Sequence, residues 1–354
     1  MKKLLALAAV ILLLTSATIE QKKSNATDSE NSYEAFGVAF YNLENLFDTI
    51  NNNGTYDKEF SPNGARQWNS EKYYKKLHNL AYAISQMATA STPYGPAILG
   101  VSEIENISVL KDLVKQEEIR KWHLQIVHHD SPDRRGIDVG LLYNPRFFRV
   151  LNVVNTPLIM PDRPNFRTRD QMCVTGLLGG EKVSVIINHW PSRLGGQEQS
   201  SPLREAAAAR VKLTVDSLLK DDPNQGIVIM GDLNDDPHDK SCAMVLGAKR
   251  NIKDVPQGGL YNPWWATLDK GVGSLAYGGS WNLFDQIIIN DYFLRSNREH
   301  LTYLNHRVLN MEFLQTKEGK YKGYPHRTYS GGAFLNGYSD HFPTQIIMVR
   351  KIKQ

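Results

Sequence analysis

The sequence predicts an α/β protein built as one large domain. From residue 36 onward, short apolar runs alternate with amphipathic segments, as expected when buried strands alternate with surface helices. The 354-residue chain is 41% hydrophobic and 22% charged, so it has enough apolar material for a sizeable core. No Pro-rich or Gly-rich linker divides it, and we therefore expect one domain at 35–352.

The N-terminus has the features of a secretory signal peptide. Two lysines precede an apolar run at 4–14 and three small residues at 15–17. The run is too short to span a bilayer comfortably, so we expect no stable membrane anchor. We predict a signal peptide at 1–24, a disordered polar spacer at 25–34, and a protein exported to the periplasm or the exterior.

Composition excludes few partners. The formal charge of +4 falls to +2 once the two lysines of the predicted signal peptide are removed. This value is well below the basic footprint of a dedicated nucleic-acid binder. A metal ion and a few local arginines are nevertheless sufficient for a polyanionic substrate. The two cysteines, Cys173 and Cys242, fit either one disulfide or two buried thiols, and neither has the spacing of a metal site.

The expected elements follow in chain order. In the first half, apolar runs and periodic faces predict a strand at 36–41, a polar loop at 48–68, a helix at 71–90, a strand at 97–101, a helix around Leu110, and strands at 124–127 and 139–143. In the second half they predict a strand pair at 173–178 and 183–187, a helix at 202–219 that opens with a proline, and strands at 227–230, 284–289 and 344–349.

Polar side chains gather where these strands end. The apolar run 227–230 leads through Gly231 to Asp232 and Asn234, which point to the same side of an extended chain because they are two apart. Four more strands end in polar pairs and a fifth begins with an acid: Asn42 and Glu44, Glu103 and Glu105, Asn188 and His189, Asp340 and His341, and Asp285. Each pair alone also fits a solvated turn. Their recurrence favours one site, since α/β proteins bind ligands at strand ends.

These residue types suit metal-assisted hydrolysis of a phosphoester. Carboxylate and amide oxygens without thiolates select a hard ion, so we expect Mg²⁺, with Mn²⁺ or Ca²⁺ as alternatives. Two imidazoles can share the proton transfers, each oriented by a carboxylate. The sequence has no nucleophilic Ser or Cys elbow and no GxxxxGK[ST] loop, which favours direct attack by water.

Six motifs in this order resemble the endonuclease/exonuclease/phosphatase superfamily. They are YNLENLF (41–47), GVSEIEN (100–106), INHWPSR (187–193), MGDLNDDP (230–237), LFDQIII (283–289) and YSDHFP (338–343). The resemblance runs from about residue 36 to 348. It implies a four-layer α/β sandwich, in which two mostly antiparallel sheets pack face to face with helices outside, and it assigns the domain at 35–352 to this superfamily.

The resemblance also implies roles for single residues. Glu103 is similar to the metal-binding glutamate of the family, with Asn42 and Asp340 near the same ion. Asp232 resembles the aspartate that orients or deprotonates the attacking water. Asn234 resembles the amide that holds that water or a phosphate oxygen.

Two histidines complete the implied catalytic set. His341 is similar to the histidine that contacts the scissile phosphate, and Asp285 to the aspartate that orients it. Family members differ on whether Asp232 or the Asp285–His341 pair is the base, so both alternatives stay open. His189 matches the second histidine of the deoxyribonuclease and sphingomyelinase branches, a candidate general acid.

The acidic partner of the second histidine is not evident in the sequence. Asp130 and Asp138 are candidates. The matching place in the strand is held by Ile137 or its neighbours, which departs from the family pattern.

Three arginines are candidates for binding substrate phosphates. Arg135 lies in SPDRRG, Arg193 follows HWPS, and Arg327 lies in PHRTY. Exposed turn charges are the alternative, because charged side chains are common on surfaces. Several aromatic residues in loop-rich stretches can stack on bases or pack in the core: Trp264, Trp265, Trp281, Tyr324 and Tyr329.

Taken together, these features predict an exported, monomeric, metal-dependent phosphodiesterase. The first candidate is a nuclease that cuts DNA, and RNA as a further substrate, by direct attack of water. The alternative is a phosphomonoesterase or a sphingomyelinase-like phosphodiesterase acting on a small or lipid phosphoester. A catalytically inactive binding module is disfavoured, because every core position of the site holds a competent side chain.

Overall fold

The computed structural model describes residues 32–50, 58–277, 279–295 and 297–352. The predicted signal peptide at 1–24 and most of the predicted spacer at 25–34 lie outside this part of the chain. Strand β1 (Tyr33–Leu46) already includes the last two residues assigned to that spacer. None of the helices in the described part combines the length and apolar character needed to cross a membrane.

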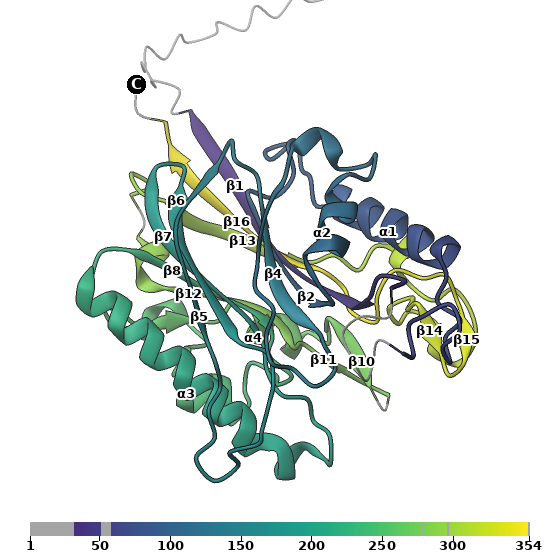
Figure 1. Ribbon diagram of the computed structural model, residues 1–354. Helices are drawn as coiled ribbons and strands as arrows, with labels where there is room; N and C mark the ends of the chain where they lie inside the picture. The colour runs from purple at the N-terminus through teal and green to yellow at the C-terminus, as the bar shows by residue number, and fades with distance from the viewer. Residues whose placement is uncertain (1–31, 51–57, 278, 296, 353–354) are drawn as a thin grey trace, which may run out of the picture. The chain divides into compact units, whose positions relative to one another are not determined.

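Two six-stranded sheets form the centre of the domain (Figure 1). Sheet A has the order β13 (Thr302–Val308), β16 (Thr344–Lys351), β1, β2 (Ile98–Ile104), β4 (Asp138–Tyr143) and β3 (Gln125–His128). Sheet B has the order β5 (Phe148–Thr156), β6 (Gln171–Leu178), β7 (Glu181–His189), β8 (Gly226–Asp232), β12 (Asp285–Asn290) and β9 (Leu260–Tyr261). Among the described strands, each sheet has one parallel pair, β1 with β2 and β7 with β8. The prediction of two mostly antiparallel sheets is confirmed.

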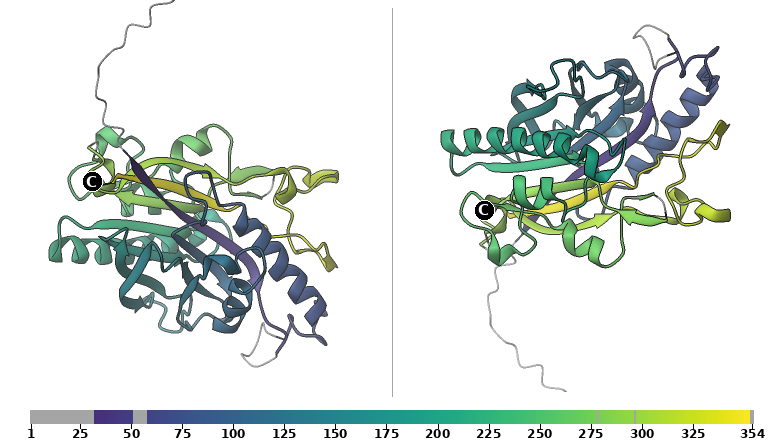
Figure 2. Two further views of the ribbon diagram at one scale, coloured as in Figure 1. Left: turned by 90° about the horizontal axis from the view of Figure 1, so that it is seen from above. Right: turned by 90° about the horizontal axis from the view of Figure 1, so that it is seen from below.

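Helices cover the outer faces of both sheets. On sheet A, α1 (Ser70–Ser85) and α2 (Ile107–Val114) pack their leucines against Leu99 and Val101 of β2. On sheet B, α3 (Gln197–Asp221) packs against β7 and β8. Figures 1 and 2 place α1 and α3 on opposite sides of the sheets. The predicted four-layer α/β sandwich is therefore confirmed.

The core explains why the strand before Asp232 is apolar throughout. Val228 and Met230 lie in the cluster between the two sheets, whereas Ile227 and Ile229 lie in the cluster under α3. All four side chains are fully buried. A strand buried on both faces has no solvent-exposed side, so its sequence is a continuous apolar run. Each such side chain contributes about 1.5–3 kcal/mol through burial.

Smaller elements surround the sheets. They are α4 (Trp264–Asp269), the hairpins β10 (Leu275–Tyr277) with β11 (Ser280–Asn282) and β14 (Tyr329–Ser330) with β15 (Ala333–Phe334), and short 3-10 or π turns at Arg120–Trp122, Ser241–Val245, Ile252–Asp254, Asp291–Leu294, Glu312–Leu314 and Gly319–Tyr321. Both hairpins lie near the end of the sheets where the polar strand ends meet (Figure 1).

The structure differs from the expected elements in several places. Strands β5 and β13 were not predicted, because both are sheet edges with many exposed residues and little apolar alternation. Helix α3 begins at Gln197 rather than at the proline at 202, and α1 ends at Ser85 rather than near residue 90. Of the two alternatives for the cysteines, the structure shows buried free thiols.

Candidate active site

The register of sheet B sets Asp232 between two other predicted site residues. Asp232 pairs with His189 of the parallel strand β7 and with Asp285 of the antiparallel strand β12. Gly231 permits this close pairing, because a Cβ there would lie 2.2 Å from the carbonyl oxygen of Asn188. The strand ends of one sheet thus bring together three residues that are far apart in the sequence.

Sheet A adds residues from strongly bent backbone. The amide Nδ2 of Asn42 donates to Oδ2 of Asp232 at 3.0 Å, which joins the two sheets. Glu44, Asn45 and Glu103 have φ values of 47°, 49° and 59°. Residues with side chains rarely adopt such values, which cost about 1–3 kcal/mol each and persist where surrounding contacts enforce them. This strain coincides with the register shift between β1 and β2, and strained backbone of this kind is common at functional sites.

His341 is the charged histidine of the site. Its Nδ1 lies 2.6 Å from Oδ2 of Asp285, which also accepts a hydrogen bond from Oγ of Ser274. Its Nε2 lies 3.8 Å from Oδ2 of Asp232. Burial alone would lower the pKa of His341, but the carboxylates of Asp285 and Asp232 outweigh burial and hold that pKa well above its ordinary value. His341 is therefore an imidazolium whose ring Asp285 orients.

His189 is the neutral histidine. Its Nε2 lies 3.5 Å from Oδ2 of Asp232 and 4.0 Å from Oε1 of Glu103. Burial holds the pKa of His189 well below its ordinary value, and the nearby Arg169 and Arg135 lower it further. The two histidines on either side of Asp232 therefore have opposite charge states.

Among the residues that the structure describes, no carboxylate orients the neutral histidine through Nδ1. Within the described part of the chain, the buried Nδ1 of His189 has no hydrogen-bond partner. The two candidate partners lie beside His128 instead, with Asp138 at 3.1 Å and Asp130 at 3.9 Å from its ring nitrogens. Neither candidate contacts His189 in the described part of the chain, and the departure from the family pattern at Ile137 or its neighbours stays a prediction.

Asp232 has the properties of a general base. Burial raises the pKa of Asp232 to about 6, against the lowering effects of His341 and of the Asn234 N–H, which donates to Oδ1 at 3.0 Å. A base with a pKa near the working pH transfers protons efficiently. The side chain of Asn234 donates to the carbonyl of Trp190 at 2.9 Å, which fixes the residue beside Asp232.

Glu103 is an anion held by charged and backbone donors. Arg135 Nη1 donates to Oε1 of Glu103 at 3.3 Å, and the N–H of Asn45 donates to Oε2 at 2.9 Å. Burial alone would raise the pKa of Glu103, but Arg135 and His341 bring it below its ordinary value. Glu103 is thus ionised and able to bind a cation.

The donor chemistry around Glu103 fits a hard divalent cation. Asp340 lies next to His341, with 3.9 Å between its Oδ1 and Nε2 of the histidine. The predicted ligands Asn42, Glu103 and Asp340 offer only carboxylate and amide oxygens. Burial and the negative charges of Glu44, Asp340 and Asp285 raise the pKa of Tyr41 well above its ordinary value. Concentrated negative potential of this kind attracts a cation.

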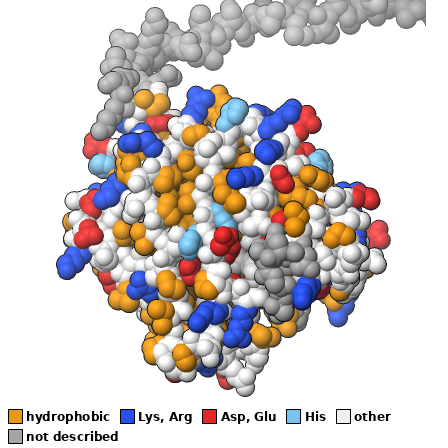
Figure 3. Space-filling model, viewed as in Figure 1, with side chains coloured by type: hydrophobic (Ala, Val, Ile, Leu, Met, Phe, Trp, Pro, Cys, Tyr) orange, Lys and Arg blue, Asp and Glu red, His pale blue; other side chains and the backbone are white. Residues whose placement is uncertain are grey.

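Two of the three predicted phosphate-binding arginines lie at the rim of the site. The side chain of Arg135 is 33% exposed and contacts Glu103. The side chain of Arg327 is 47% exposed and donates to Asp340 at 2.8 Å and to Glu44 at 3.3 Å. Figure 3 shows basic and acidic side chains interspersed over one face of the molecule, in keeping with the weak net charge, so any attraction of a polyanion depends on such local groups.

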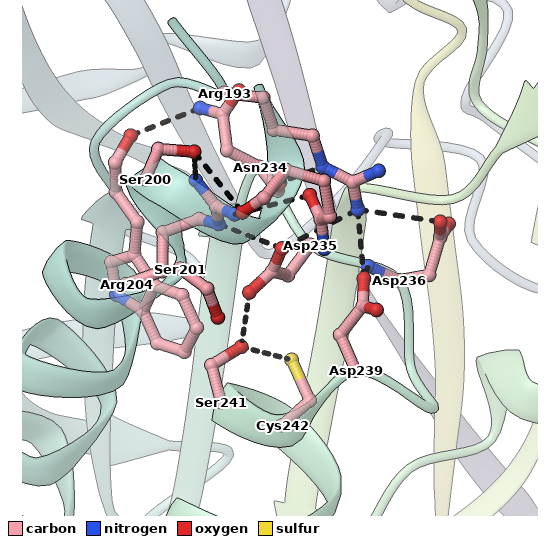
Figure 4. A network of polar contacts seen from close by, with 12 residues as sticks. Arg193, Ser200, Ser201, Arg204, Asn234, Asp235, Asp236, Asp239, Ser241 and Cys242 are labelled. Carbon is pink, nitrogen blue, oxygen red and sulfur yellow. Dashed lines mark hydrogen bonds and ion pairs between the residues drawn. The ribbon is translucent and has the colours of Figure 1, made fainter. Parts of the chain in front are cut away.

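The third arginine has a different place. Arg193 donates from Nη2 to Asp239 at 2.7 Å and lies 3.3 Å from Asp235, and its Nε donates to the backbone oxygen of Asn234 at 2.8 Å (Figure 4). The fully buried Arg204 completes this network through a 2.7 Å ion pair with Asp235. These acceptors occupy Nε and Nη2 of Arg193, and the expected phosphate contact stays a prediction. Arg193 clamps the loop that follows β8.

Sequence reasoning assigned no role to three residues that support the site. Glu44 accepts from Arg327 and from the N–H of Thr328, and Lys76 of α1 is buried with its Nζ 2.5 Å from Oγ1 of Thr328. Ser274 holds the carboxylate that orients the charged histidine. Lys76 could have been found from the sequence, because it is a lysine among the leucines of an amphipathic face. Glu44 could have been found from its place in the NLEN motif. Ser274 had no signal in the sequence.

Comparison with known proteins identifies a family for residues 37–351. Over this range the sequence matches the model described as "Endonuclease/Exonuclease/phosphatase family". No curated protein matches the sequence.

Solved structures with the same fold include enzymes of different specificity. ANGEL2, described as a 2′,3′-cyclic phosphatase, has 13% identity, a TM-score of 0.57, and coverage of 91% of this chain and 98% of its own. D. rerio TDP2, complexed with a single-strand DNA product, has 12% identity, a TM-score of 0.54, and coverage of 89% and 98%. A mannosyl-6-phosphatase from Bacteroides thetaiotaomicron has 16% identity, a TM-score of 0.52, and coverage of 88% and 99%. At these identities the likeness establishes the fold alone.

Proposed function

The chain belongs to the endonuclease/exonuclease/phosphatase family of metal-dependent phosphoester hydrolases, and from this premise we propose that it is an exported nuclease. The proposed reaction is hydrolysis of a phosphodiester bond in DNA, with RNA as a further substrate. The observation that carries the proposal is Asp232 placed between a neutral histidine, His189, and a charged one, His341. Hydrolysis of a diester needs a proton acceptor for water and a proton donor near the leaving oxygen, and this arrangement offers both.

Each proposed role follows from a charge state and a contact. Asp232 takes the proton of the attacking water, and the N–H of Asn234 holds its carboxylate in place. His341 contacts the scissile phosphate as an imidazolium, and Asp285 keeps its ring oriented. His189 stays uncharged beside Asp232 and can donate a hydrogen bond from its ring N–H to the reacting oxygens. The proton for the leaving oxygen then comes from the imidazolium of His341 rather than from His189, the candidate general acid of the sequence.

Glu103, with Asn42 and Asp340, would hold the divalent cation, for which we propose Mg²⁺, with Mn²⁺ or Ca²⁺ as alternatives. A bound ion of this kind polarises a phosphoryl oxygen and offsets the charge that develops on it. Arg135 and Arg327 pair with Glu103 and Asp340 at the rim and so reduce the negative charge that an approaching polyanion meets.

Export and oligomeric state are part of the same proposal. The predicted signal peptide at 1–24 supports a periplasmic or secreted enzyme. The monomeric state stays part of the proposal. The TDP2 structure complexed with single-strand DNA supports nucleic acid as the substrate, whereas the two phosphatases of the same fold support the alternative of a small phosphoester.

The test measures turnover by purified mature protein with Mg²⁺, Mn²⁺ and Ca²⁺ in turn. The substrates are plasmid DNA, RNA, a panel of phosphomonoesters and sphingomyelin, and Asp232→Asn is the control protein. We expect metal-dependent nicking of plasmid that disappears in the control. Intact plasmid together with release of phosphate or phosphocholine would overturn the nuclease proposal and establish the phosphatase or phospholipase alternative.

A further inference from the structure

A cavity of about 520 Å³ borders the catalytic residues. Arg327 and Asp340 form part of its wall, and Asp340 lies 3.9 Å from Nε2 of His341, so the cavity opens beside the proposed catalytic residues. The remaining wall includes Tyr277 of the β10–β11 hairpin and the segment 316–335, which carries the β14–β15 hairpin. We call this cavity the tyrosine pocket and define it by Tyr277, Lys320, Tyr321, Tyr324, Arg327 and Asp340.

The tyrosines present flat aromatic surface to solvent. Tyr277 is 79% exposed and Tyr321 is 49% exposed. The ring of Tyr324 lies 5.9 Å from the ring of Tyr321 and 5.4 Å from that of Trp281. Trp281 in turn stacks on Phe342, at 6.0 Å, and Phe342 directly follows the charged histidine. A continuous series of ring contacts therefore runs from Tyr321 in the pocket to Phe342, the residue after His341.

Two cations flank this aromatic surface. Arg327 lies at the catalytic end, and Nζ of Lys320 lies 5.6 Å from the ring of Tyr321. Among the described lining residues, Asp340 is the single acid, and Arg327 pairs with it. Aromatic surface combined with positive charge is the composition with which proteins bind single-stranded nucleic acid, because the rings stack on bases and the cations attract phosphates.

A second cavity near the site has the opposite character. Its volume is about 670 Å³, and its described lining contains six acids and no Lys or Arg: Asp48, Glu105, Asp112, Asp130, Asp133 and Asp138. Such a cavity repels a phosphate backbone. Of these two cavities, the tyrosine pocket is the one whose charge suits a phosphate backbone.

We propose that the tyrosine pocket binds the unstacked base of a nucleotide adjacent to the scissile phosphate, so that the enzyme prefers single-stranded over duplex nucleic acid. This inference rests on the proposed nuclease function and adds the class of substrate. A base in a duplex is paired and stacked on both sides, and entering the pocket would require its extrusion. A base in a single strand enters at a much smaller cost.

The experiment measures cleavage of a labelled single-stranded oligonucleotide and of the matching duplex by the mature protein with Mg²⁺. The variants are Tyr321→Ala, the conservative Tyr321→Phe, and Tyr94→Ala as a matched control. Tyr94 is also a tyrosine of similar exposure, 45%, and it lies outside the tyrosine pocket. Tyr277→Ala provides a second test in which folding is not at risk, because that ring is 79% exposed.

We expect faster cleavage of the single strand than of the duplex by the unaltered protein. Tyr321→Ala and Tyr277→Ala should each raise KM for the single strand about ten-fold, the usual scale of a lost stacking contact, with kcat nearly unchanged. Tyr321→Phe, which keeps the ring, should restore KM, and Tyr94→Ala should match the unaltered protein. With an oligonucleotide that lacks a base at each position near the cut, the difference between Tyr321→Ala and the unaltered protein should disappear.

Two results would overturn the inference in distinguishable ways. If DNA is cut but both alanine variants keep the KM of the unaltered protein, the pocket assignment is wrong and the nuclease function stands. If no nucleic acid is cut while small phosphoesters are hydrolysed, the nuclease function and the base assignment are both wrong.

Discussion

The floor of the site and its mouth are built in different ways. The floor consists of Asp232, Asp285 and His341, which are 3%, 0% and 7% exposed. Sheet register pairs Asp232 with Asp285, and a hydrogen bond to Asp285 holds His341, which precedes β16. The mouth consists of exposed side chains such as Arg327 and Tyr277 on short hairpins and loops. The difference leads to the hypothesis that the buried floor carries the chemistry and the exposed mouth selects the substrate. Changes in the floor should therefore alter kcat, and changes in the mouth should alter KM.

The largest effect should follow from removing the base of the floor. Asp232→Asn should lower kcat by about 10²–10⁴-fold, the scale of general acid–base catalysis. The fold should be retained at a cost of about 1–3 kcal/mol, because the single amide oxygen of the new residue can accept from Asn42 or from the N–H of Asn234 but not from both. Thermal melting controls for folding. Turnover close to that of the unaltered protein would show that Asp232 is not the base. It would also contradict the expectation that changes in the floor alter kcat.

A slightly smaller loss should follow from uncoupling the charged histidine. Asp285→Asn removes the carboxylate that keeps His341 protonated, and kcat should fall about 10²-fold. The matched control, Ser274→Ala, removes only a hydroxyl that donates to Asp285, and its effect should stay below about ten-fold. Equal effects of the two variants on kcat would contradict the role of the Asp285 charge.

The next prediction concerns Glu103 and the metal ion that it is proposed to bind. Chelation with EDTA should abolish turnover, and Glu103→Gln should raise the half-activating Mg²⁺ concentration about ten-fold or more because one anionic ligand becomes neutral. Calorimetric titration of Mg²⁺ into the protein without substrate gives a reading independent of activity. An unchanged binding isotherm would show that Glu103 is not a ligand.

The smallest effects should separate the two arginines. Arg193→Gln leaves Asp235 and Asp239 facing each other, and we expect it to lower the free energy of unfolding by about 1–3 kcal/mol and to reduce kcat through Asn234. Arg327→Gln should instead raise KM for the phosphoester with little change in melting temperature. Denaturant unfolding measures the stability of both variants, and steady-state kinetics measures their kcat and KM. If Arg193→Gln changes only KM, Arg193 contacts the substrate rather than stabilising the loop after β8.

Much of the floor was predictable from sequence for a local reason. The run 227–230 followed by Gly231 and Asp232 identifies a buried strand with polar groups at its end, and the structure has that strand end at Asp232. The clamp of Arg193 was not predictable, because its acceptors lie about 40 residues further along the chain. Strand β5 was missed for another reason, namely that edge strands need no apolar alternation.

By itself the sequence determined the four-layer class, the strands that carry the site, and the kinds of side chain at their ends, because apolar periodicity and short motifs are properties of neighbouring residues. Only the tertiary structure decided that His341 is charged and His189 neutral, that Asn42 meets Asp232 across 190 residues of chain, and that the tyrosines gather beside Arg327. The physical reason is that charge state and pocket shape depend on burial and on distances through space, which join residues that the sequence keeps apart.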